Sequence, residues 1–166
     1  MIPVSEKELR ESFVNCSKGE ATRINPPGGL DRLPWQDLDF LGWRDPKAPD
    51  RGYLVVEHRD RLVGVSMRVP TGVRRSLVKT TVCSICLTAH PGTGVSLFAA
   101  PKAGASGRQG NTVGTYICAD LACPLYVRGK KFSALGARFE ESMTLEEQLA
   151  RTMANLEQFL EQVFKP

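Results

Sequence analysis

The most regular hydrophobic pattern in the chain lies in TLEEQLARTMANLEQFLEQVF, residues 144–164. Apolar side chains recur there at intervals of three and four residues, which places them on one face of a helix. They are Leu145, Leu149, Met153, Leu156, Leu160 and Val163. Thr144 and Glu147 have the spacing of a capping box and predict where this helix begins. We expect the long amphipathic helix to dock on a sheet of the same chain.

A period of two replaces this pattern in YLVVEHRDRLVGVSMRVP, residues 53–70. Two β-branched runs flank a polar turn, which predicts a β-hairpin with Val63, Val65 and Met67 on its buried face. His58 lies at the turn, where we expect it to face solvent.

A second hairpin is predicted from the extended runs VSLFAA, residues 95–100, and TVGTYIC, residues 112–118. Glycine and serine dominate the connecting loop, residues 101–110, and almost no bulky residue interrupts them. We expect that loop to be exposed and mobile, and to be a place where a partner makes contact.

The N-terminal region combines a helical pattern with a segment rich in proline, glycine and aspartate. Residues 5–24 predict one helix, with a capping box formed by Ser5 and Glu8 and with Cys16 on its buried face. Residues 25–52 predict connected turns with a short extended piece around residues 38–43. We expect Trp35 and Trp43 to anchor this segment on the core, because large aromatic side chains supply much of the buried area of a small protein.

These elements predict an α+β fold of antiparallel hairpins with an N-terminal helix and a long C-terminal helix. We expect residues 1–50 to pack on a main domain formed by residues 51–166. The 166 residues are 42% hydrophobic and 24% charged, which is typical of a globular protein. No apolar run is long enough to cross a membrane, and the polar start of the chain does not resemble a secretory signal. We therefore expect a cytoplasmic monomer without membrane contact.

The charge is unevenly distributed along the chain. The net charge is +4, yet residues 140–166 carry six acidic and two basic side chains, so the rest of the chain carries +8. A basic body favours an acidic protein partner or RNA, although a mixture of charges that only maintains solubility would give the same count.

Four of the five cysteines form two close pairs, Cys83-x2-Cys86 and Cys118-x4-Cys123, with 31 residues between them. Short-spaced pairs let one turn present two thiolates to a tetrahedral zinc ion. The first pair follows a predicted strand and suits a knuckle turn, whereas residues 119–122 can form the first turn of a helix, as in a treble clef. Cys16 stands apart, and we do not expect it to bind the metal.

Other uses of the cysteines fit less well. A thioredoxin-type CxxC needs a βαβ context, the H-x-E motif of zinc deaminases is missing, and the x4 spacing differs from rubredoxin-like iron sites. Four cysteine ligands leave no open position on zinc, so we expect a structural ion and no enzyme activity. His90 is then expected to be a residue beside the ligands or on the surface, and Asp120 to accept amide hydrogen bonds between the ligands.

The motifs CSIC and GTYICADLAC, together with SKGEATRI and YLVVEHRDRLVGVSMRVP, resemble the FBP family. This family comprises the elongation factor G-binding proteins, among them the FusB-type fusidic acid resistance proteins, and its C-terminal domain is a treble-clef zinc finger. The resemblance implies that Cys83, Cys86, Cys118 and Cys123 hold one zinc ion. It also implies that the protein binds elongation factor G, modulates its release from the ribosome and has a link to fusidic acid resistance.

We expect contact with the factor at the finger loop and its neighbours. The candidate contact residues are Phe98, Lys102, Arg108, Tyr116, Arg128, Lys130 and Lys131. The alternative function is an RNA- or ribosome-binding zinc module, whose basic footprint would be Arg59, Arg61, Arg68, Arg74, Arg75 and Lys79. The lack of aromatic residues among those basic side chains argues against this alternative.

Overall fold

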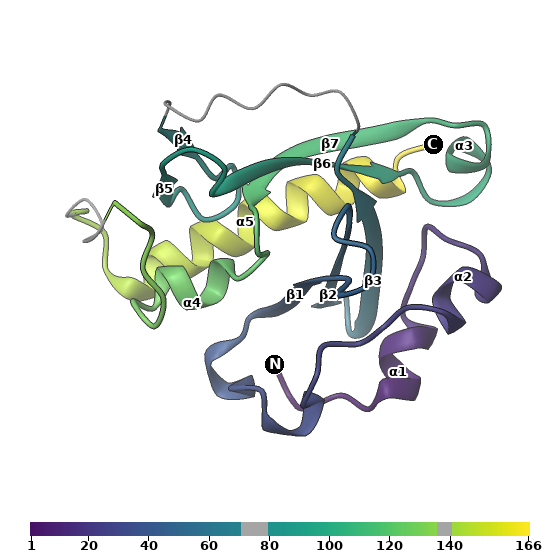
Figure 1. Ribbon diagram of the computed structural model, residues 1–166, viewed down its shortest axis with the longest axis horizontal. Helices are drawn as coiled ribbons and strands as arrows, with labels where there is room; N and C mark the ends of the chain where they lie inside the picture. The colour runs from purple at the N-terminus through teal and green to yellow at the C-terminus, as the bar shows by residue number, and fades with distance from the viewer. Residues whose placement is uncertain (71–79, 136–140) are drawn as a thin grey trace.

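A five-stranded antiparallel sheet forms the centre of the protein in a computed structural model that describes residues 1–70, 80–135 and 141–166 (Figure 1). The strand order is β1-β2-β3-β6-β7. The bounds are β1 Phe40–Arg44, β2 Arg51–His58, β3 Arg61–Arg68, β6 Val95–Pro101 and β7 Thr112–Cys118. A separate two-stranded sheet pairs β4 Thr81–Val82 with β5 Ala89–His90. The predicted α+β class with antiparallel hairpins is confirmed.

The predicted hairpin at residues 53–70 is formed by β2 and β3, with His58 opposite Arg61. The two residues between them, Arg59 and Asp60, have φ angles of 49° and 60°. When both central residues of a two-residue turn have a left-handed backbone, the twist of the turn matches the twist of the two strands that it joins. Val63, Val65 and Met67 are fully buried, as the alternation predicted.

The exposure predicted for His58 is wrong, because the side chain is only 9% exposed. Its ring stacks on Phe164 with 6.0 Å between ring centroids, and its Nδ1 lies 4.0 Å from Glu157 Oε1. Both neighbours belong to the C-terminal helix, about 100 residues further along the chain. The β2–β3 turn therefore packs against the C-terminal helix.

The second predicted hairpin is formed by β6 and β7, paired from Val95 with Cys118 to Pro101 with Thr112. Its connection is not a plain loop, because it contains the short helix α3, Gly104–Arg108. The Ala103 amide donates to the Val163 carbonyl at 2.8 Å and fastens α3 to the C-terminal helix.

The N-terminal region holds two short helices, α1 Glu6–Glu11 and α2 Lys18–Thr22, so the prediction of one helix over residues 5–24 is wrong. Each helix has its own capping box, the second formed by Ser17 and Glu20. Between the helices the backbone pairs with β3: the Gly64 amide donates to the Ser12 carbonyl at 2.8 Å. Cys16 lies in this break and is only partly buried, contrary to expectation.

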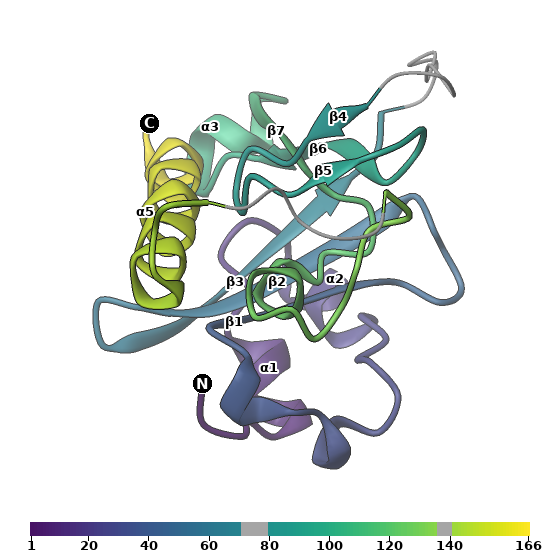
Figure 2. The same cartoon turned by 90° about the vertical axis from the view of Figure 1, so that its left-hand side faces the viewer.

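Helix α5, Leu145–Phe164, crosses one face of the sheet (Figure 2). Leu156, Leu160 and Val163 are fully buried there, and burial of each such side chain contributes about 1.5–3 kcal/mol. Leu145, at the start of the apolar stripe, is 49% exposed and lies outside the docked part. The predicted docking of the helix is otherwise confirmed. None of the helices in the described ranges has the length and apolar character to cross a bilayer.

The two faces of the sheet belong to different cores. Leu54 and Val56 face the core that contains α5 and the four paired cysteines. Tyr53 and Val55 alternate with them along β2 and face a second core, which is formed with the N-terminal segment. Trp35 in the 3-10 helix η2, Trp35–Asp37, and Trp43 in β1 are both buried in this second core, as predicted. A further 3-10 helix, η1, covers Leu30–Arg32.

Candidate metal centre

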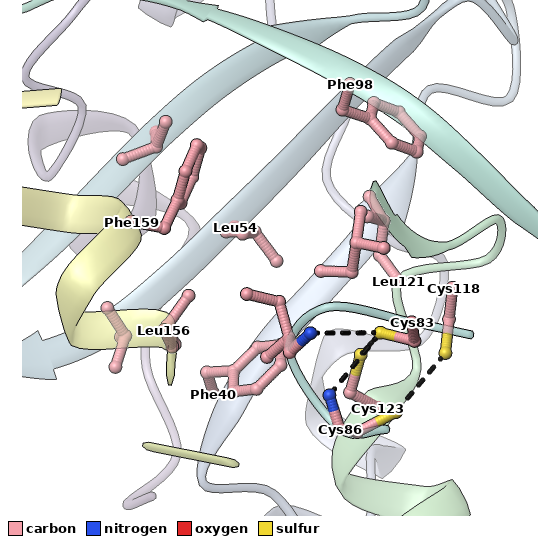
Figure 3. Close-up of a cluster of buried hydrophobic side chains, with 14 of the residues drawn as sticks. Phe40, Leu54, Cys83, Cys86, Phe98, Cys118, Leu121, Cys123, Leu156 and Phe159 are labelled. Carbon is pink, nitrogen blue, oxygen red and sulfur yellow. Dashed lines mark hydrogen bonds between the residues drawn. The ribbon is translucent and has the colours of Figure 1, made fainter. Parts of the chain in front are cut away.

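Four buried cysteines meet at one edge of the main core (Figure 3). Cys83 and Cys86 come from the knuckle after β4, Cys118 ends β7, and Cys123 begins helix α4, Cys123–Val127. Their sulfur atoms all lie within 4.8 Å of one another. The two predicted pairs, far apart in sequence, are therefore brought together.

The spacing of the sulfurs matches a tetrahedral zinc ion. Cys83 Sγ and Cys123 Sγ are 3.7 Å apart, and Cys86 Sγ and Cys118 Sγ are 3.5 Å apart. Zn–S bonds of about 2.3 Å in a tetrahedron separate the sulfurs by about 3.8 Å. The donor set is also the soft, anionic one that zinc prefers. The residues present fit one structural zinc ion.

The predicted knuckle turns backbone amides toward a sulfur. The amides of Ile85 and Cys86 both donate to Cys83 Sγ at 3.4 Å. Leu87 has a φ of 58°, and its amide closes the turn on the Cys83 carbonyl at 3.0 Å. Amide donors stabilise the charge of a thiolate, so this turn prepares Cys83 to bind a cation.

The segment between Cys118 and Cys123 is not the helical turn that we predicted. Leu121 has a φ of 61°, and α4 begins only at Cys123, with Pro124 in its first turn. Asp120 holds this bend in place, as expected of an amide acceptor: its Oδ1 accepts from the Ala122 amide at 3.2 Å. Its Oδ2 also accepts from the Tyr126 hydroxyl at 2.9 Å.

Two polar side chains that are not ligands contact the sulfur atoms. His90 Nε2 lies 3.3 Å from Cys118 Sγ, and the Thr88 hydroxyl oxygen lies 3.2 Å from Cys86 Sγ. His90 is buried, and this burial lowers its pKa, which favours a neutral ring that can donate its Nε2 hydrogen to the sulfur. His90 is therefore a hydrogen-bond partner of a ligand, one of the two places expected for it.

The thiols influence one another strongly. Hydrogen bonds from the neighbouring thiols, that of Cys118 first, lower the pKa of Cys83, whereas burial raises the pKa of Cys123. Four thiolates so close together repel one another in a buried site. A divalent cation relieves that repulsion and allows all four sulfurs to be ionised.

The predicted contact residues do not form one surface. Tyr116 is 48% exposed, but Phe98 is wrong as a contact residue because it is fully buried in the core, where Arg44 lies 5.0 Å above its ring. Lys102 and Arg108 lie by α3, at the end of the β6–β7 hairpin opposite to the metal centre.

The basic residues after α4 form ion pairs near the metal centre. Arg128 donates two hydrogen bonds to Asp39, of 2.5 and 3.0 Å, and is mostly buried. Lys130 lies 3.7 Å from Asp37. Lys131 lies 2.5 Å from Asp120. Arg128 and Lys130 thus join α4 to the N-terminal segment, while Lys130 and Lys131 stay about half exposed.

Three residues of the alternative RNA-binding footprint lie outside the described residues, namely Arg74, Arg75 and Lys79.

The sequence reasoning missed exposed apolar side chains beside the metal centre. Val82 and Leu87 flank the knuckle and are 50% and 41% exposed. The Ser84 amide donates to the Tyr116 carbonyl at 2.7 Å, which attaches the knuckle to β7. We call Val82, Leu87 and Tyr116 the knuckle surface. The apolar residues on either side of CSIC were the available signal.

A sequence profile described as the FBP C-terminal treble-clef zinc-finger matches residues 8–163. The chain belongs to this family. Membership in this zinc-finger family and the four buried cysteines together identify the metal of the FBP-family centre as zinc.

A solved structure, that of the fusidic acid resistance protein FusC, is similar to the FBP-family chain with a TM-score of 0.47 and 16% sequence identity. The similarity covers 93% of this chain and 62% of FusC, so the chain spans less than two thirds of the length of that protein. No curated protein sequence matches the chain.

Proposed function

We propose that this FBP-family protein is a zinc-organised adaptor that binds translation elongation factor G and modulates its release from the ribosome. The observation that carries the proposal is the FBP zinc-finger match over nearly the whole chain. A protein that works on this factor would act in the cytoplasm. If it shortened the stay of a drug-stalled factor, it would also protect translation from fusidic acid.

The chemistry of the centre supports binding rather than catalysis. All four positions of a tetrahedral zinc ion are taken by cysteine sulfurs, and such closed sites have a structural role. The ion fixes the knuckle and the end of β7 relative to each other, which preorganises any surface that they carry.

We propose the knuckle surface as the contact with the factor. Exposed apolar side chains in a fixed arrangement are typical of interaction sites, and tyrosine is enriched among the residues that dominate binding energy. Lys130 and Lys131, each partly exposed, would add the basic charge that favours an acidic partner.

Calorimetric titration with purified elongation factor G at modest salt tests this function. We expect micromolar or tighter binding by the zinc-loaded protein, and about tenfold weaker binding after Tyr116→Ala, the usual effect of truncating an important interface residue. Ile2→Ala is the matched control, because Ile2 is 72% exposed but belongs to the N-terminal segment.

No binding of the factor at micromolar concentrations would refute the proposal. Binding to ribosomal RNA alone, with a steep decrease as salt rises, would instead support the RNA-binding alternative.

A further inference from the structure

A cleft far from the zinc centre separates the N-terminal helices from α3. It has a volume of about 620 Å³. Its walls come from the break between α1 and α2, the end of β3, and the segment from Pro101 to Arg108. Helices α2 and α3 lie at the same end of the molecule (Figure 1). Clefts of this size are typical of small-molecule sites.

The cleft has an excess of positive charge. Arg68, Lys102 and Arg108 line it, against the single carboxylate of Glu20. That carboxylate already accepts hydrogen bonds from the Ser17 amide at 2.9 Å and the Ser17 hydroxyl at 2.8 Å. It interacts electrostatically with Arg68. Among the described residues, no carboxylate lies within ion-pair distance of any of the three cations.

The floor of the cleft is held by Asn15. Its Nδ2 donates to the carbonyls of Ser66 and Pro101, both at 2.9 Å, and its Oδ1 accepts from the Ser66 amide at 2.8 Å. One side chain thus joins the helix break, β3 and β6. These bonds fix the backbone that carries the cleft, so the three cations line a preformed space.

The far wall depends on close backbone packing in α3. A Cβ atom at Gly107 would lie 1.8 Å from the Lys102 carbonyl oxygen, so only glycine allows the chain to curl this tightly. The curl brings Lys102 and Arg108 to the same cleft. Lys102 Nζ also reaches the Pro166 carbonyl at 3.4 Å, a contact that an anion in the cleft can replace.

We propose that this cleft binds a small phosphorylated ligand about the size of a mononucleotide, with its phosphate among Arg68, Lys102 and Arg108. Arginine and lysine are the side chains that proteins use for phosphate, arginine through paired hydrogen bonds. Val14 and Pro101 supply an apolar wall for the rest of the ligand. Enclosure by three chain segments favours a compact ligand over a continuous polymer backbone.

Cys16 provides a direct report of occupancy, because it lines the same cleft and stands apart from the zinc cysteines. Burial raises the pKa of this thiol to about 11, so alkylation is slow but measurable at alkaline pH. A ligand in the cleft would shield the sulfur.

The experiment follows alkylation of Cys16 by iodoacetamide in the full zinc-loaded chain, with AMP as the probe and adenosine as the control without phosphate. We expect alkylation to be about tenfold slower at saturating AMP, since only unoccupied protein reacts, and unchanged with adenosine. Removing two cations with Arg68→Gln and Arg108→Gln should weaken AMP binding at least about tenfold, because each loses a charge-assisted hydrogen bond. Arg32→Gln, in η1 outside the cleft, is the matched control.

The proposal is overturned by unchanged Cys16 reactivity in millimolar AMP, by equal protection from adenosine, or by full protection in the double variant. Binding of only an RNA oligonucleotide or of polyglutamate would also overturn it, because neither is a compact phosphate ligand. The result is independent of elongation factor G, whose binding is measured separately.

Discussion

The sulfurs of the zinc centre differ in their surroundings. Cys83 receives two backbone amides, Cys86 lies beside the Thr88 hydroxyl, and Cys118 lies beside His90. These contacts stabilise thiolate charge and orient the sulfurs, which is how partners outside the ligand set tune a metal site. Loss of a ligand and loss of such a partner should therefore have different consequences.

Replacing a ligand should release the metal. In Cys86→Ser we expect loss of stoichiometric zinc and of the cooperative thermal transition, because zinc supplies about 10 kcal/mol or more of folding free energy in small zinc fingers. Cys16→Ser should keep both. Metal analysis and calorimetry of the two purified variants make the comparison, and stoichiometric zinc with a cooperative melt in Cys86→Ser would show that the ligand assignment is wrong.

Replacing the partner of a ligand should only weaken the site. We expect His90→Ala to bind zinc about 10- to 100-fold less tightly, because Cys118 loses a hydrogen-bond donor. His90→Gln, which keeps a donor, should recover part of the affinity. Competition with a chromogenic chelator measures both; equal affinity in the wild type and His90→Ala would contradict this role.

At this scale the sequence predicted the ligands but not their supporting geometry. Spacing alone identified the four cysteines, because two short pairs are a local signal. The burial of Phe98 and the stacking of His58 on Phe164 depend on distant segments. No local pattern in the chain reveals such contacts.

Among the elements, β1 and the loop between Cys118 and Cys123 approach unusually closely. A Cβ atom at Gly42 would lie 2.3 Å from the Leu121 carbonyl oxygen and 2.7 Å from Leu121 Cβ. Glycine at this point lets the ligand loop rest directly on the edge strand. The N-terminal segment, which supplies β1, thereby supports the zinc centre.

This contact predicts that Gly42→Ala will disturb both stability and metal binding. We expect a loss of about 1–3 kcal/mol, the usual cost of overpacking, together with weaker zinc affinity as the ligand loop shifts. Gly28→Ala should change neither, because no atom lies within 4 Å of a Cβ there. Urea unfolding and chelator competition provide the measurements, and a Gly42→Ala protein equal to the control would refute the coupling.

Elements with complete local signals were predicted correctly, as the capping box and apolar stripe of α5 show. The helix predicted over residues 5–24 failed because a tertiary contact prevailed: pairing of Ser12 and Val14 with Gly64 interrupts it. Its second capping box, Ser17 with Glu20, was visible in the sequence and marks the restart. Helix α3 had no such signal, since a glycine- and serine-rich stretch more often predicts a loop.

At the scale of the whole molecule, one sheet carries two separate surfaces. The knuckle surface lies at the end of β7 that carries Cys118, and the basic cleft lies at the other end of the same hairpin, about 20 Å away for a seven-residue strand. The ion pair between Arg128 and Asp39 joins α4 to the N-terminal segment on the other face. We therefore expect metal loss to reach the whole fold, while changes in the cleft leave the knuckle surface intact.

The most direct test of the central proposal is calorimetric titration of the zinc-loaded protein with purified elongation factor G, repeated with Tyr116→Ala and Ile2→Ala. The account predicts one binding event at micromolar affinity or tighter that is weakened about tenfold by Tyr116→Ala and unaffected by Ile2→Ala. Absence of binding by the fully metallated, folded protein would contradict the account.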